Sequence, residues 1–291
     1  MFITMKKYQY YLCMAALATC LSCEKAVLPE SDEPGNDGTP VFRIRVECLE
    51  QTGFESRAVG KLEDYCSKMT FVLYDQTGEK VVSLHQDSSE ASFGSVSMNV
   101  PYGEYHLLVI GHQGEKNCTV KADGGVTFDR ASDVTDTFWY YGNVQFTESS
   151  PDLSVTLKRV VAKMELTCLD PLPSNVKKVS LKYSQATGTL DLQTGYGKTR
   201  ATITKDFEIT DVMTGQPQTF AFFIFPQEDE VMLNVIFKAY DGYGTEVGGK
   251  ELKDVPMRRN TITRYQGEIF GRSVGMRAMI EADWQTIDYK P

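Results

Sequence analysis

The chain has 291 residues, of which 30 are Lys or Arg and 39 are Asp or Glu, so its net charge is -9. At about 150 residues per domain, this length predicts two domains. A hydrophobic content of 42% excludes a wholly disordered chain. The acidic balance argues against nucleic-acid binding and against a polybasic membrane-surface patch. With three His residues, the chain also has little material for a His-built catalytic or metal site.

The N-terminus has the features of a targeting segment. Two Lys residues precede an apolar run over residues 11–21, which is too short to cross a bilayer as a helix. The run ends at Ser22-Cys23, which resembles a bacterial lipobox. Residues 1–22 are therefore predicted to be a signal peptide, with Cys23 as the lipidated first residue of the mature chain, where several acyl chains give a stable anchor. The alternatives are an ordinary secretory signal and lipidation at Cys20.

The next segment, residues 23–40, is rich in Pro, Gly and acidic residues and is predicted to be a flexible tether. Four Cys residues follow it, at positions 48, 66, 118 and 168. Their spacing is not that of a metal site, although they could form two disulfides. Because Cys48 and Cys168 share the apolar phase of alternating runs, we interpret them as small core residues.

From residue 41 onward the chain has the pattern of β-strands. Phe42, Ile44, Val46 and Cys48 alternate with charged residues, which is the period of a half-buried strand. Turn-forming sequences rich in Gly separate the later apolar runs, and only residues 62–68 could form a short helical turn. Further strands of the first half are expected at residues 69–74, 96–100, 105–110 and 144–147.

A change of phase near residue 157 predicts a domain boundary. Leu153, Val155 and Leu157 are apolar at odd positions, whereas the run from Val160 to Cys168 is apolar at even positions. One strand cannot bury both runs on the same face without a bulge or a crossing. We therefore expect an all-β chain of two tandem antiparallel β-sandwich domains, at residues 41–157 and 158–291. Strands of the second domain are expected at 176–183, 189–192, 201–209, 219–225, 231–240 and 261–269.

Motifs that carry enzyme chemistry are not found in the sequence. It contains no Gly-x-Ser-x-Gly, no His-Glu-x-x-His and no calcium-binding loop of the EF-hand type. Gly197-Lys198-Thr199 lacks the earlier Gly and the following helix of a phosphate-binding loop. His106 has the opposite phase to its apolar neighbours and is predicted to face solvent. No enzyme activity and no cofactor are expected.

Three segments together resemble the fimbrillin-like family of bacterial fimbrial subunits. Residues 157–166, followed by Asp170-Pro171-Leu172-Pro173, are similar to the start of the second domain in that family. Residues 255–263 are similar to a late strand of that domain, and Phe138-Trp139-Tyr140-Tyr141-Gly142 to a motif of its minor, anchor-type subunits. The resemblance implies two transthyretin-like Greek-key sandwiches and a surface lipoprotein that is held to the outer membrane by lipid and assembles into type V fimbriae.

The resemblance also implies how such subunits function. It predicts adhesion without enzyme activity, with other fimbrial subunits and a host or bacterial surface receptor as partners. In stalk subunits of the family a trypsin-like protease cuts after an Arg behind the first strand. Here Arg57-Ala58 has that placement, although an anchor subunit would not need the cut and Arg57 could be an ordinary loop residue.

Strand exchange between subunits is expected to use the two ends of the chain, because an unpaired strand edge accepts a strand from another chain. The first candidate strand carries Phe42, Ile44 and Val46. The second, near the C-terminus, carries Met276, Ala278, Ile280 and Trp284, and either closes the second sandwich or is donated to the next subunit.

The alternative function is a stand-alone surface lipoprotein that binds glycan or host protein through loops. It would need exposed aromatic side chains, and residues 138–141 are the best cluster in the sequence. An aromatic run beside a domain boundary is more often part of interdomain packing.

Overall fold

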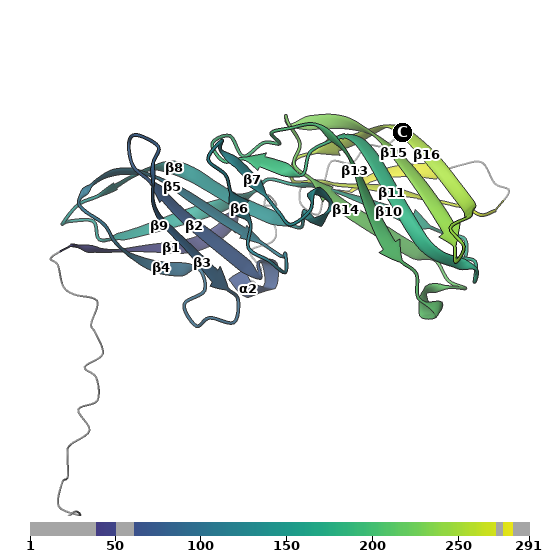
Figure 1. Ribbon diagram of the computed structural model, residues 1–291, viewed down its shortest axis with the longest axis horizontal. Helices are drawn as coiled ribbons and strands as arrows, with labels where there is room; N and C mark the ends of the chain where they lie inside the picture. Colours follow the sequence, from purple (N-terminus) through teal and green to yellow (C-terminus); the bar gives the residue numbers. More distant parts are fainter. Residues whose placement is uncertain (1–38, 51–60, 272–275, 282–291) are drawn as a thin grey trace, which may run out of the picture. The chain divides into compact units, whose positions relative to one another are not determined.

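The computed structural model describes residues 39–50 and 61–271, and the backbone of residues 276–281. Strands make up most of these residues (Figure 1). Helical structure in the described ranges is confined to α2 (Leu62–Tyr65) and to the 3-10 turns η1 (Ala131–Asp133) and η2 (Asp211–Met213). The predicted all-β fold with two β-sandwiches is confirmed.

The first sandwich is one seven-stranded sheet that parts into two layers. The strand order is β3-β2-β5-β8-β9-β1-β4, and β8 and β9 share only the pairs Phe138–Arg159 and Trp139–Lys158. Because this junction is so short, the sheet can fold over, and one core takes side chains from both groups of strands. The strands are β1 (Val41–Glu50), β2 (Lys68–Tyr74), β3 (Lys80–Asp87), β4 (Ser95–Asn99), β5 (Gly103–His112), β8 (Thr137–Phe146) and β9 (Asp152–Arg159).

The second sandwich consists of two four-stranded sheets around a core of its own. One sheet has the order β14-β10-β17-β18 and the other has the order β13-β11-β15-β16. The strands are β10 (Ala162–Cys168), β11 (Val176–Ala186), β13 (Ala201–Glu208), β14 (Gln218–Ile224), β15 (Glu230–Asp241), β16 (Glu246–Arg258), β17 (Ile262–Gly267) and β18 (Met276–Glu281).

The change of phase seen in the sequence takes place at Val160 and Val161. Both residues are fully buried although they are adjacent, so β9 and β10 turn opposite faces inward and lie in different sheets. Only these two residues separate Arg159 from Ala162. The predicted domain boundary between residues 157 and 158 stays a prediction, because Pro40–Pro291 forms one compact unit that contains both sandwiches.

A third apolar cluster joins the two sandwiches. It is built on a small sheet of the order β12-β7-β6, in which β6 (Thr119–Val120) and β7 (Gly125–Thr127) precede β9 in the chain and β12 (Thr189–Asp191) follows β10. The cluster covers the outer face of the first sandwich, where β2 and β5 carry the buried residues Val72, Leu108 and Ile110. These two strands are therefore buried on both faces.

This covering corrects the prediction for His106. The residue does point away from the core of the first sandwich, but it is half-buried and its ring stacks on Tyr141 at 5.9 Å between centroids. Solvent was expected on this face because the sequence gives no sign that a second chain segment covers it.

Cys48 is a second correction. The sequence places it in the core, but it is exposed, because the pairing of β1 with β9 shifts by one residue between Val46 and Cys48. Such a bulge reverses the two faces of a strand, so Leu49 turns toward the core in its place. Cys66, Cys118 and Cys168 are buried, and these four described Cys residues are free thiols.

Candidate functional site

The first strand of the described chain is an inner strand of its sheet. β1 pairs in parallel with β9 on one side and antiparallel with β4 on the other. Its alternation determines which face it turns to the core, since Phe42 and Ile44 are buried while Arg43 and Arg45 are exposed. Val46 is only half-buried, because the bulge follows directly after it.

Phe42 packs against two other aromatic rings. Its ring stacks on Phe146 at 4.2 Å between centroids, with an interplanar angle of 19°, and meets the edge of Tyr102 at 5.8 Å. On the neighbouring strands, Met98 stands opposite Phe42 and Val96 stands opposite Ile44. A chain without β1 would therefore have an apolar groove between β4 and β9, with two rows of unpaired backbone groups along its sides.

The last described strand, β18, lies at an edge of the second sandwich. It pairs antiparallel with β17, and its backbone register places Met276 opposite Gly267, Ala278 opposite Tyr265, and Ile280 opposite Thr263. The other long side of β18 has no neighbouring strand within the described part of the chain. Trp284 lies outside the described residues, as do Cys23, Arg57 and Ala58.

The aromatic run at residues 138–141 lies at the junction of the two sandwiches. Phe138 is fully buried in the first core, whereas Trp139 and Tyr141 pack against the third cluster. The Trp139 Nε1–H donates to the carbonyl oxygen of Leu192 at 2.9 Å. A Cβ at Gly195 would lie 2.9 Å from the Trp139 ring, so the loop after β12 can close over this ring only with a glycine there. The run is thus interdomain packing rather than an exposed platform.

A buried ion pair holds the passage between β9 and β10. The Arg159 guanidinium donates to both carboxylate oxygens of Asp136, at 2.7 and 2.9 Å, and to the Asn260 side-chain oxygen at 3.2 Å. It also lies 4.7 Å from the centre of the Phe138 ring. Removing one partner of such a buried pair typically costs about 3–5 kcal/mol, because the other charge stays buried.

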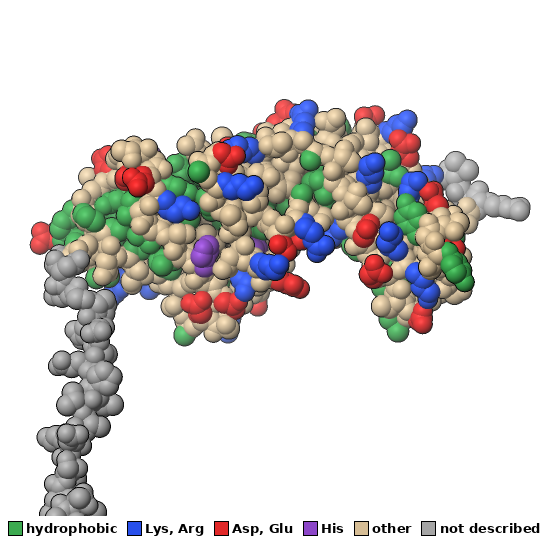
Figure 2. Space-filling model, viewed as in Figure 1, with side chains coloured by type: hydrophobic (Ala, Val, Ile, Leu, Met, Phe, Trp, Pro, Cys, Tyr) green, Lys and Arg blue, Asp and Glu red, His purple; other side chains and the backbone are tan. Residues whose placement is uncertain are grey.

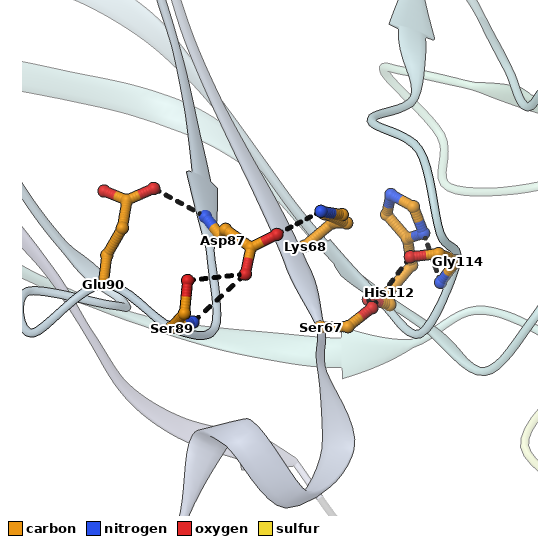
Figure 3. Close-up of polar contacts among 7 residues, drawn as sticks. All are labelled: Ser67, Lys68, Asp87, Ser89, Glu90, His112 and Gly114. Carbon is orange, nitrogen blue, oxygen red and sulfur yellow. Dashed lines mark hydrogen bonds and ion pairs between the residues drawn. The ribbon is translucent and has the colours of Figure 1, made fainter.

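Figure 3 shows a polar cluster at the start of β2, where β3 and β5 end. Lys68 pairs with Asp87, and together with the Ser89 hydrogen bonds this lowers the pKa of Asp87 to about 2. Ser67 Oγ donates to the Gly114 carbonyl at 2.8 Å and not to the His112 ring, so Ser67 and His112 do not form a nucleophile–base pair.

His112 is held neutral in this cluster. Its Nδ1 accepts the Gly114 N–H at 3.0 Å, and its buried Nε2 has no hydrogen-bond partner among the described residues. Burial, with a smaller contribution from Lys68, lowers the pKa of His112 to about 4. The described residues contain no group of three or more His, Cys, Asp or Glu that could hold a metal ion. Within the same residues, no helix is long and apolar enough to span a bilayer.

The comparison with protein-family models gives one match. It extends over residues 116–289, which is 174 of 291 residues, and the family is described as a family of unknown function, DUF6562. This chain belongs to DUF6562. The matched region contains β6, β7, the junction and the second sandwich, whereas β1–β5 precede it. No protein of curated function matches the chain.

Solved structures show where else the DUF6562 member's fold occurs. One is a candidate adhesin from Bacteroides thetaiotaomicron, with 9% identity, a TM-score of 0.53, and coverage of 85% of this chain and 98% of that one. Another, from the same organism, is a candidate polysaccharide-binding protein, with 9% identity, a TM-score of 0.51, and coverage of 86% and 98%. At such identities the likeness shows the fold alone, and this fold extends over nearly the whole length of the two solved proteins.

A weaker likeness reaches a fimbrial protein. The tip fimbrial protein Mfa3 from Porphyromonas gingivalis, in a C-terminally truncated form, has 11% identity and a TM-score of 0.43, with coverage of 83% of this chain and 99% of that one.

Proposed function

We propose that this protein is a lipid-anchored, non-enzymatic fimbrial subunit that acts in fimbria assembly or anchoring and in cell adhesion. Cys23 carries the lipid, residues 23–40 link it to the first sandwich, and the anchored protein is exposed at the surface of the outer membrane. Its partners are other fimbrial subunits and a receptor on a host or bacterial surface. Subunits are joined by exchange of β-strands.

The observation that carries this proposal is the position of β1. It is the first strand of the described chain, yet it fills the space between β4 and β9 rather than an edge. Full burial of Phe42 and Ile44 is worth roughly 3–6 kcal/mol. This is a large part of the 5–15 kcal/mol that typically stabilises a domain. A subunit that lost β1 would have to refill the groove, and a strand from another subunit has the right form to do so.

The place of β1 in the chain supports its departure. It is preceded by the predicted tether and followed by Glu55-Ser56-Arg57-Ala58-Val59-Gly60, a polar stretch in which Arg57-Ala58 is our candidate processing site. Cleavage there would leave β1 attached to the sandwich only by non-covalent contacts. A strand of ten residues could then be exchanged without breaking any further covalent bond.

Immunogold electron microscopy of cells that express the full-length protein tests the proposal. We expect gold label along filaments or at their bases in cells with the protein, and loss of filaments or of their attachment in cells without it. Label on the bare cell surface, together with a purified monomer that binds glycans or host protein, would contradict the proposal and favour a stand-alone surface lipoprotein.

A further inference from the structure

The large apolar side chains that are exposed on this protein gather at the two ends of the unit Pro40–Pro291. The register of β1, β9 and β4 places Val41 and the loop that bears Tyr102 at the strand ends away from the β9–β10 passage. In the second sandwich, β10, β11 and β15 run so that Leu169, Val212 and Tyr243 lie at the strand ends away from that passage. We call these two surfaces the Val41 end and the Tyr243 end.

Among the residues whose burial the structure describes, seven large hydrophobic residues are exposed; five of them belong to these two ends, and Val81 and Met232 are the other two. Single exposed apolar residues are common on soluble proteins, so their gathering matters more than their number. At the Tyr243 end, the β15–β16 hairpin and the η2 turn are neighbours, because Lys177 pairs with Asp211 and lies beside Gly242. Figure 2 shows apolar side chains at the loop ends drawn at the lower right, where Figure 1 places these two turns.

Tyr243 stands in a turn that does not need a tyrosine. The hairpins β2–β3 and β15–β16 close in the same way: Asp75 or Asp241 accepts two backbone N–H groups of its turn, and Gly78 or Gly244 takes a φ of +82°. At the third position of the first turn, the Thr77 hydroxyl also bonds to the aspartate, at 2.6 Å. Tyr243 replaces that threonine in the second turn and is 97% exposed.

The turn of Val212 is likewise held by other groups. Val212 is 79% exposed, while its carbonyl accepts the Gln216 amide at 2.6 Å and the Thr214 hydroxyl donates to the Asp211 carbonyl. Two rigid turns therefore present an aromatic and a β-branched side chain to the outside, and neither side chain is needed to hold its turn. Because the backbone of each turn is already fixed, it loses little conformational entropy when a partner covers these side chains.

We infer that the Tyr243 end of one copy docks onto the Val41 end of a second copy that still holds its own β1, with Tyr243 and Val212 against Tyr102 and Val41. The Val41 end offers the same pair of side-chain types, and both are about half exposed. A contact between unlike ends joins copies head to tail, which produces an open filament unless the rotation between copies closes a ring. The choice of a second copy as the occupant rests on the proposed fimbrial function, whereas the location of the two ends does not.

The contact also sets a direction for the filament. Val41 follows directly after the predicted tether, so in an anchored copy the Val41 end is the one joined to Cys23. The Tyr243 end of that copy is then free to receive the Val41 end of the next one. Each added copy presents a new Tyr243 end.

Site-specific crosslinking between two differently tagged full-length copies tests the inference. One copy carries Tyr243→Cys and the other Tyr102→Cys, and both carry Cys48→Ser to remove the exposed native thiol. After treatment of co-expressing cells with a short bismaleimide, we expect at least ten times more adduct between the two tags than for Met232→Cys paired with Tyr102→Cys. Thermal unfolding of each variant checks that it is folded.

Equal adduct yields for the test and control pairs would overturn the inference, and so would adducts only between two copies of Tyr243→Cys. Labelling of Tyr243→Cys by reagent without any adduct between copies would also overturn it, since the occupant would then be something else. Electron microscopy of the same cells separates the two proposals. Filaments without the Tyr243–Tyr102 adduct would refute the docking contact alone, and the adduct without filaments would refute the fimbrial function alone.

Discussion

At the scale of single residues, His112 shows how burial and one hydrogen bond fix a protonation state. Its Nδ1 accepts the Gly114 N–H. A proton added to Nδ1 would turn this acceptor into a donor, which would then face the Gly114 N–H, another donor. Its ring packs edge-on against Phe128 at 5.0 Å, and Phe128 stacks on Phe225 of the second sandwich. Protonation of this ring would thus disturb the packing of the third cluster.

We predict that His112 makes the protein less stable in mild acid. The pKa is about 4 in the folded protein and about 6.5 when unfolded, so between these values the unfolded chain binds more protons. The free energy of unfolding is then at its full value above pH 6.5 and falls as the pH drops toward 4, by roughly 3 kcal/mol in all. Urea unfolding from pH 7 to pH 4 should show a shallower loss for His112→Asn, which keeps an acceptor near Nδ1. Phe128→Leu is the control, and an unchanged slope in His112→Asn would contradict the prediction.

Cys23 is the second residue with a direct test. Metabolic labelling with a fatty-acid analogue should mark the wild-type protein and Cys20→Ala, but should leave Cys23→Ala unlabelled, because only a thiol can accept the diacylglycerol. The labelled protein is detected after immunoprecipitation. Label that persists in Cys23→Ala and disappears in Cys20→Ala would move the site to Cys20.

At the scale of elements, the sequence predicted the strands that alternate cleanly and missed those that do not. The alternation of Phe42 and Ile44 and the apolar phase of residues 160–168 both correspond to strands of the structure. β6 and β7 contain two or three residues each, which is too short for a period to be recognised, whereas β12 was expected, at residues 189–192. Cys48 was misplaced because a bulge leaves no mark in the hydrophobic pattern. The phase of the apolar alternation can thus be read from the sequence. Bulges, and segments that cover the outer face of a sheet, depend on contacts between residues far apart in the chain.

The segment after β1 has its own prediction. Limited trypsin digestion of the full-length protein, followed by N-terminal sequencing, should give a fragment that starts at Ala58, because the polar stretch 55–60 contains Arg57 and trypsin cuts after Arg. Arg57→Gln should remove this fragment and leave other cleavage products unchanged. If trypsin cuts at other Lys and Arg sites while Arg57-Ala58 resists, the processing role is wrong.

Removal of β18 distinguishes the two roles of the C-terminal strand. If the chain is truncated before Ser273 and the strand closes the second sandwich, that sandwich should unfold or lose several kcal/mol, since β17 would lose its edge partner. If the strand is donated to a neighbour, the monomer should still unfold cooperatively while assembly stops. Circular dichroism melting and electron microscopy give the two readouts, and truncation after Glu281 is the control. Intact folding together with intact assembly would exclude both roles.

At the scale of the whole molecule, the two sandwiches are joined by packing as well as by the chain. The third cluster, the Trp139–Leu192 hydrogen bond and the Arg159–Asp136–Asn260 contacts all connect residues before β9 with residues after β10. Aromatic packing at the boundary was expected from the sequence, whereas the added sheet was not. The match to DUF6562 begins at residue 116, before β6, so it includes the segment that reaches across to β12.

We predict that Gly195→Ala weakens this joint. Gly195 and Gly244 both have a positive φ, so alanine at either position costs about 1–2 kcal/mol of backbone strain. Only at Gly195 would the new Cβ also meet Trp139 and Arg259, whereas Gly244 has open space around it. Calorimetry should show a single unfolding transition for the wild type and for Gly244→Ala, and two separated transitions for Gly195→Ala. Identical melting profiles of the two variants would show that the loop does not couple the sandwiches.

The short passage between β9 and β10 determines how the protein responds to pulling force. Three Cα steps from Arg159 to Ala162 can extend to only about 10 Å. The passage can therefore lengthen very little before a pulling force reaches the second sandwich. Tension that enters at Val41 acts along β1, whose hydrogen bonds to β9 and β4 are then loaded in shear and must break together. A cell held by this protein would therefore be held by a stiff link that fails abruptly, and not by a spring.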